Sequence, residues 1–171
     1  MADKARDILG LVLSSDSPVF LSLILIHVAA GILCVVAGAM AMLVKKSHRS
    51  HPRWGSFYFW SLSVVFVTCI GLSILRWPLD NSLLVLGILS FAMAVLGRTA
   101  HRKLQPGWAR WHLVGMSGSY IFLLTAFYVD NGPNLPLWKL LPPLWFWILP
   151  GLIGIPLMVV AFLRNPLTRM K

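Results

Sequence analysis

Acidic residues are scarce in this chain: five aspartates and no glutamate stand against fifteen lysines and arginines. The two cysteines, Cys34 and Cys69, both lie inside long apolar runs and form no CxxC pair, so neither a disulfide nor a thiol redox motif is predicted. The sequence also lacks GxSxG, HExxH and phosphate-loop motifs, as well as paired carboxylates. These absences set aside the common hydrolase classes.

Apolar residues dominate the chain instead. They make up 58% of the sequence, while charged residues make up only 12%, about half of the roughly 25% found in soluble domains. A soluble protein of this length has too little interior to hide so much apolar surface, whereas a lipid bilayer accommodates it. The composition therefore predicts an integral membrane protein.

Five segments are long and apolar enough, or nearly so, to cross a hydrocarbon core that needs about 20 residues per helix. They cover residues 19–44, 54–75, 80–97, 111–129 and 143–163. The sequence thus predicts an all-α bundle of five transmembrane helices within residues 18–164. An N-terminal segment, 1–17, precedes the bundle and a basic tail, 165–171, follows it. Apolar residues between 8 and 13 suggest a short surface helix in the N-terminal segment.

Charge placement predicts the orientation of the bundle. If all five segments cross, eleven cations and no carboxylate lie on one side of the membrane, and the positive-inside rule makes that side cytoplasmic. The eleven cations are Lys45, Lys46, Arg49, Arg53, Arg98, Arg102, Lys103, Arg110, Arg164, Arg169 and Lys171. The first apolar run is too long for a signal-peptide core, and its positive cluster follows it. We therefore expect the N-terminus outside and the C-terminus in the cytoplasm.

Small residues recur at helical spacing on three of the spans, which predicts the faces where helices pack. In lipid, such residues allow two helix backbones to approach closely. The predicted faces are His27, Gly31, Cys34, Gly38 and Ala41 on the first span, Gly87, Ser90, Ala94, Gly97 and, beyond the membrane edge, His101 on the third, and His112, Gly115, Ser119 and Ala126 on the fourth. In the last span, Pro150 and Pro156 predict either a bent packing helix or a hinge beside a cavity.

His27 and His112 are the clear ionisable candidates within the spans, where such groups are costly and often functional. Counting about 1.5 Å per residue, His27 lies roughly 12 Å below the outer surface and His112 within one or two turns of the inner surface. Their predicted depths differ by about 10 Å or more, which makes one shared haem awkward. Each histidine is interpreted either as a cofactor ligand or as a neutral, hydrogen-bonded packing residue.

His51, with His48, belongs to the basic stretch between the first two spans. Their spacing is one that metal ligands use, but so many cations without a carboxylate repel a bare divalent cation, and no metal site is predicted. Lipid phosphates or haem propionates suit these arginines better. We expect anionic lipid headgroups as partners on this side. Nucleic acid is not expected, because the charge lies in loops against the membrane.

Three histidine-bearing patches resemble one family. They are His27-Val28-Ala29-Ala30-Gly31, the stretch from Lys45 through His48 and His51 to Arg53-Trp54-Gly55, and the stretch from Trp111-His112 to Ser119-Tyr120. Over residues 20–160 the chain resembles small predicted bacterial multi-pass membrane proteins grouped as domain of unknown function 2306. The resemblance implies a helical fold in the bacterial cytoplasmic (inner) membrane, with roles for His27, His51 and His112. Where the family often has Arg-His, this chain has Trp111-His112.

Several functions remain open from the sequence. The first hypothesis is a protein that handles a redox cofactor, haem or quinone, with His27, His112 and His51 as the binding residues. The second is a small transporter whose path is lined by the last span, and the third is a non-catalytic assembly factor that packs against itself or another membrane protein. The length, the five spans and the tryptophans also resemble the tryptophan-rich sensory proteins, with a faint match at 142–145. No residue is assigned a catalytic role.

Overall fold

The computed structural model describes residues 6–8, 11–13, 18–44, 49–75, 81–104 and 106–169. Among these residues, five helices are long and apolar enough to cross a membrane. They are α1 (Pro18–Leu43), α2 (Ser50–Leu75), α3 (Asn81–Lys103), α4 (Trp108–Asn131) and α5 (Leu144–Arg164). The predicted all-α architecture with five spans is confirmed, and the chain has the build of a multi-pass membrane protein.

Short elements flank these helices. They are the strands β1 (Arg6–Ile8) and β2 (Leu11–Leu13), the 3-10 helices η1 (Gly132–Asn134) and η2 (Trp138–Leu140), and the short helix α6 (Pro166–Arg169). The strands are antiparallel, with Ile8 opposite Leu11. The expected N-terminal surface helix is therefore wrong. Glycine at position 10 disfavours a helix, and the β-branched Ile8 and Val12 favour extended backbone.

Three helices extend past the apolar runs that predicted them. The helix α2 begins at Ser50, α3 continues to Lys103, and α4 begins at Trp108, whereas the apolar runs begin or end at 54, 97 and 111. Hydropathy locates only the part of a helix that suits hydrocarbon, while backbone hydrogen bonding continues into the interfacial layer. As a result, many of the basic residues and histidines expected in loops are held on helical turns.

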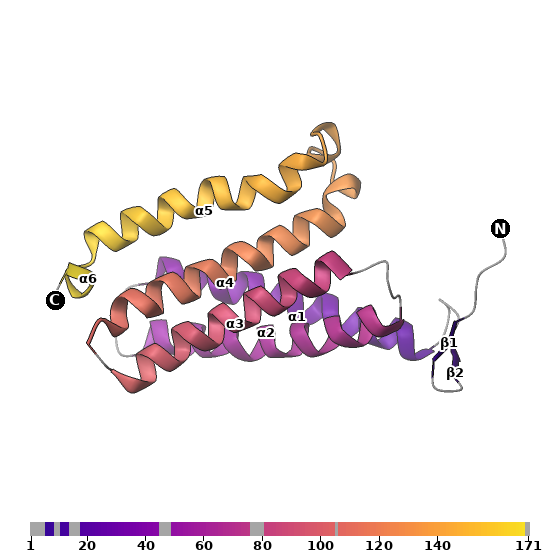
Figure 1. Cartoon of the computed structure of the whole chain (residues 1–171), viewed down its shortest axis with the longest axis horizontal. Coiled ribbons are helices and arrows are strands. Elements are labelled where there is room, and N and C mark those ends of the chain that lie inside the picture. Colours follow the sequence, from indigo (N-terminus) through magenta and orange to yellow (C-terminus); the bar gives the residue numbers. More distant parts are fainter. Residues whose placement is uncertain are drawn as a thin grey trace. The chain divides into compact units, whose positions relative to one another are not determined.

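The chain divides into two compact units, residues 1–84 and 85–171, which are described separately. In the first, α1 and α2 form an antiparallel pair (Figure 1). The buried side of α1 carries Cys34 and Gly38, as the small-residue pattern predicts, together with Ala37, which that pattern did not include. Gly31 departs from that prediction, because a Cβ atom at this position meets no described atom within 4 Å.

The second unit contains most of α3 together with α4, α5 and α6, and here glycines bring the helices together. A Cβ atom at Gly115 of α4 would lie 2.5 Å from the backbone nitrogen of Gly97 in α3. The predicted faces of these helices are confirmed at Ser90, Ala94 and Gly97 and at Gly115 and Ser119, all of which are buried. Across the α4–α5 contact, a Cβ atom at Gly154 would lie 2.5 Å from Ile121.

The helix α5 contains both prolines, Pro150 and Pro156, and is continuous from Leu144 to Arg164. At its end the chain turns through Asn165 into α6, which lies against the beginning of α4 (Figure 1). The C-terminal part of this unit and the α3–α4 connection therefore lie at the same end of the unit.

Candidate functional site

His27 lies on α1 and contacts α2 through a side-chain hydrogen bond. Its Nδ1 is 2.8 Å from the hydroxyl oxygen of Thr68, which is buried. That hydroxyl lies 2.8 Å from the carbonyl oxygen of Val64 and 3.0 Å from that of Val65. We infer that the hydroxyl proton bonds to one of these carbonyls, so that the hydroxyl oxygen accepts the proton on Nδ1. The lone pair of the neutral ring is then on Nε2.

His51 lies in the first turn of α2 and its Nδ1 donates to the carbonyl oxygen of Ala41 in α1, at 2.8 Å. This carbonyl belongs to the last turn of α1, where backbone oxygens have no partner within the helix. His51 therefore caps the end of α1. The 14 residues from His27 to Ala41 correspond to about 21 Å along α1, so the structure does not bring these two predicted histidines into one site.

His112 belongs to the second unit, on α4. Its Nδ1 donates to the carbonyl oxygen of Gly97 in α3, at 2.9 Å, directly beside the contact between Gly97 and Gly115. A carbonyl only accepts hydrogen bonds, so the proton is on Nδ1 here as well. The three predicted histidines thus share one arrangement: each uses Nδ1 to hold a neighbouring helix. Histidines that ligate metals are usually oriented by the same kind of bond.

The sequence did not predict a cluster of three rings, formed by His101, Trp108 and His112. The cluster lies at the end of the second unit where α3 connects to α4. The ring centroid of His101 lies 5.2 Å from the centroid of Trp108 and 5.2 Å from that of His112. The centroids of Trp108 and His112 are 6.3 Å apart. The sequence nevertheless contained a signal for this cluster. A short connection between two antiparallel helices places residues just before it against residues just after it.

Arg110 completes this end of the second unit. Its Nε donates to the carbonyl oxygen of Thr168 in α6, at 2.7 Å. The Thr168 hydroxyl in turn bonds to the carbonyl oxygens of Phe162 and Asn165, and the residue is almost fully buried. Arg110, one of the cations predicted on the cytoplasmic side, is exposed and at the same time holds α6 through this hydrogen bond.

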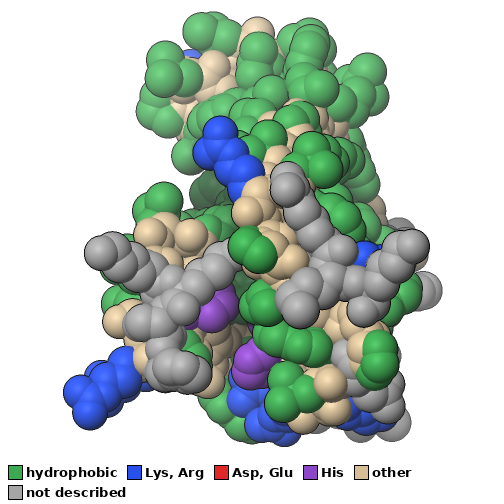
Figure 2. Space-filling view, turned by 90° about the vertical axis from the view of Figure 1, so that its left-hand side faces the viewer, with side chains coloured by type: hydrophobic (Ala, Val, Ile, Leu, Met, Phe, Trp, Pro, Cys, Tyr) green, Lys and Arg blue, Asp and Glu red, His purple; other side chains and the backbone are tan. Residues whose placement is uncertain are grey.

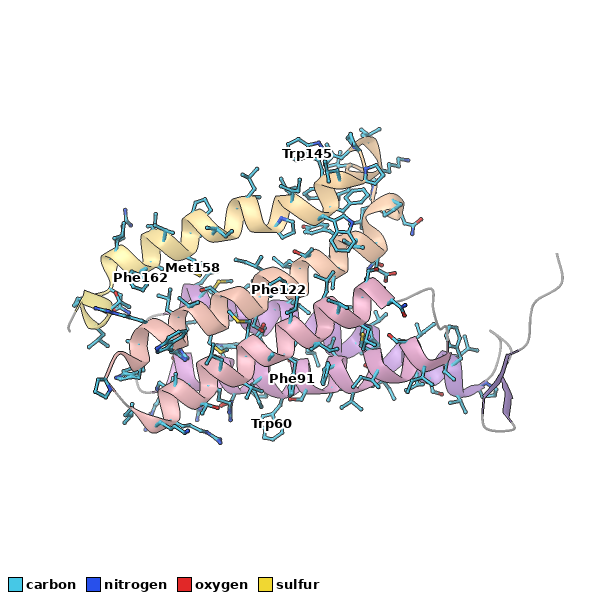
Figure 3. All side chains as sticks on the ribbon, in the orientation of Figure 1. Trp60, Phe91, Phe122, Trp145, Met158 and Phe162 are labelled. Carbon is cyan, nitrogen blue, oxygen red and sulfur yellow. The ribbon has the colours of Figure 1, made fainter. Side chains whose placement is uncertain are left out.

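No group of three or more histidine, cysteine or acidic side chains is placed to hold a metal ion among the described residues. His48, which was considered beside His51, lies outside them. A shallow groove on α2 is lined by Pro52, Arg53, Ser56, Phe57 and Trp60. Figure 3 shows Trp60 projecting away from the helices, and none of the three predicted histidines lines this groove.

Comparison with known proteins gives no relative: no family model, no curated protein and no solved structure matches the chain.

Proposed function

We propose that this chain is a multi-pass protein of the bacterial cytoplasmic membrane that binds haem through His27. The N-terminus is outside and the C-terminus inside, as the distribution of its fifteen lysines and arginines supports. Membership of the family grouped as domain of unknown function 2306 is part of the same proposal, and it rests on the three histidine patches.

The observation that carries the proposal is the bond between His27 and Thr68. The inferred tautomer has its lone pair on Nε2, through which histidine ligates iron. The two cofactors considered make different demands on this tautomer. A quinone carbonyl needs a donor, and the single N–H of a neutral His27 is directed to Thr68. Haem iron needs a lone pair, so the geometry favours haem over quinone.

Gly31, one turn along α1 from His27, supports the same choice. Residues four apart lie on one face of a helix, and a Cβ atom at Gly31 meets no described atom within 4 Å. A flat macrocycle held by His27 needs a position beside the helix without a side chain, and glycine is the residue that permits such close approach. In that site His27 would hold the iron, Thr68 would orient the imidazole, and Gly31 would make room for the ring. A haem bound there would supply one-electron transfer.

The experiment is an absorption spectrum of the purified protein, oxidised and reduced, after expression with a haem precursor. We expect a Soret band in the wild-type protein and its loss in His27→Ala. Gly31→Leu should also lose the band, because the leucine side chain would occupy the position that the macrocycle needs. His51→Ala is the matched control: it removes another interhelical imidazole from the same helix pair and should keep the band.

A colourless wild-type protein would reject haem binding, as would a His27→Ala variant with an unchanged spectrum. In that case the contact with Thr68 would favour the packing role, and the chain would be better described as a non-catalytic membrane assembly factor. His27→Ala should then lower the thermal stability without altering any spectrum.

A further inference from the structure

We propose that the end of the second unit formed by the α3–α4 connection is a binding site for the phosphate headgroup of an anionic phospholipid. The site consists of His101, Arg102 and Lys103 at the end of α3 and Trp108 at the start of α4. It lies in a different unit from His27, so it does not depend on haem binding.

Charge is the first argument. His101, Arg102 and Lys103 are consecutive and exposed on the last turn of α3, and Arg98 lies one turn earlier on the same helix. The only acidic residue in the sequence from 85 to 171 is Asp130, at the opposite end of α4. The 20 residues from Arg110 to Asp130 correspond to about 30 Å of helix, beyond the Debye length of about 8 Å at physiological salt.

Figure 2 shows lysine, arginine and histidine side chains on the face that it displays, and no described acidic side chain there. Among the described residues of the second unit, the charge at this end of α3 is therefore positive. A phosphate is the natural counter-charge, since arginine forms paired, charge-assisted hydrogen bonds with its oxygens.

Rigidity is the second argument. His101 packs edge-on against Trp108, with an interplanar angle of 75°, and also contacts the ring of His112. His112 is in turn fixed to the Gly97 carbonyl oxygen, where the two helices meet at their glycines. The imidazole of His101 is thus positioned by neighbours before any ligand arrives, which lowers the entropy cost of binding.

Exposed apolar residues beside the cations select a lipid over a soluble phosphate. Leu104 follows Lys103 and is 63% exposed, and Trp111 is 58% exposed. Leu104 also has a positive φ of 47°, a left-handed conformation that is unfavourable for a residue other than glycine. Glycine is the usual residue at such a helix end. The leucine at this position offers an apolar contact for acyl chains next to the charges that hold the headgroup.

The test uses the full-length protein in nanodiscs of neutral phosphatidylcholine, into which phosphatidylglycerol is titrated while retained lipid is measured by native mass spectrometry. We expect phosphatidylglycerol to be retained at least fivefold over phosphatidylcholine. The double variant Arg102→Gln/Lys103→Gln should lose most of this preference, and His101→Gln should lose part of it. Lys139→Gln removes a cation in η2 near the other end of α4 and should retain the full preference.

Three results would overturn the proposal. The first is equal retention of the two lipids by the wild-type protein. The second is an equal loss in Lys139→Gln and in Arg102→Gln/Lys103→Gln, which would mean that only total charge matters. The third is displacement of the lipid by inorganic phosphate or glycerol phosphate at concentrations comparable to those of the lipid, which would identify a site for a soluble anion.

Discussion

The α1–α2 pair and the α3–α4 pair are both antiparallel helix pairs joined by side-chain hydrogen bonds, and they differ in the close backbone contact that the α3–α4 pair adds. Side chains of α1 and α2 cross the contact: His27 reaches Thr68, and His51 reaches the Ala41 carbonyl. Between α3 and α4 the backbones themselves meet at Gly97 and Gly115. Lipid supplies no hydrophobic force between helices, so close packing and interhelical hydrogen bonds must provide the stability. The chain uses both close packing and interhelical hydrogen bonds, and the closest packing of backbones occurs between α3 and α4.

The largest effect is expected from Gly115→Ala. The added methyl group would lie 2.5 Å from the Gly97 nitrogen, 2.7 Å from the Gly97 Cα and 2.7 Å from the Met93 carbonyl oxygen. These are backbone atoms that cannot rotate away, so α3 and α4 must separate. We expect a loss of about 3 kcal/mol in the free energy of unfolding, at the upper end of overpacking effects, measured by denaturation in mixed micelles.

Gly118→Ala is the matched control for that substitution. Its methyl group would meet the end of the Met93 side chain, at 2.6 Å from Cε, and methionine adapts easily. We expect a loss well below that of Gly115→Ala. Equal losses would show that the backbone contact is not what holds this pair.

The second largest loss of stability is expected from removing the hydrogen bond between His27 and Thr68. His27→Ala and Thr68→Val should each lower stability, and the double variant should lose less than the sum of the two, because the same bond is removed twice. We expect a coupling energy of about 0.6–1.7 kcal/mol, the range found for hydrogen bonds between membrane helices. A double-mutant cycle measures it, and additive losses would exclude the bond.

A smaller effect is expected from Ser90→Ala. The Ser90 hydroxyl donates to the Ser119 carbonyl oxygen at 2.9 Å, and the two hydroxyls are 3.4 Å apart. Alanine fits the same space, and the Ser119 carbonyl keeps its bond within α4. We expect a loss of about 0.6 kcal/mol, smaller than that of Gly115→Ala. A larger loss than for Gly115→Ala would show that a side-chain hydrogen bond stabilises the α3–α4 pair more than its backbone contact does.

The smallest effect is expected from Gly31→Ala. The methyl group meets no described atom, and alanine favours a helix over glycine by about 0.8–1.0 kcal/mol in water. Denaturation should therefore show unchanged or slightly higher stability. A clear loss would place Gly31 on a packed face, as the small-residue pattern alone had suggested, and would make the two pairs more alike.

Much of the fold could be predicted because hydropathy and helix length are local properties of the sequence. The five spans were found within one or two residues wherever the apolar run sets the boundary. The ends at Ser50, Lys103 and Trp108 were not found, because a helix continues into the interfacial layer after its hydrophobicity ends. Gly31 was misassigned for a related reason: helical spacing identifies a face, but not which of its residues the partner helix reaches.

The candidate site was only partly predictable. The cost of an ionisable group in hydrocarbon singled out His27 and His112, but it named none of their partners. Thr68 is one of many hydroxyl residues, and finding it requires the register of α1 against α2. The acceptors of His51 and His112 are backbone carbonyls, which every residue has. The group of His101, Trp108 and His112 was accessible in principle, since it follows from the short connection between α3 and α4.

The backbone carbonyl acceptors of these hydrogen bonds have a consequence for comparing homologous sequences. Ala41, Gly97 and Thr168 accept hydrogen bonds from His51, His112 and Arg110 through main-chain oxygen, so the hydrogen bond imposes no requirement on the side chain at those three positions. Substitution there need not be matched by substitution of the donor. Correlated changes between aligned positions should therefore reveal the pair of His27 and Thr68 far more readily than the other three contacts.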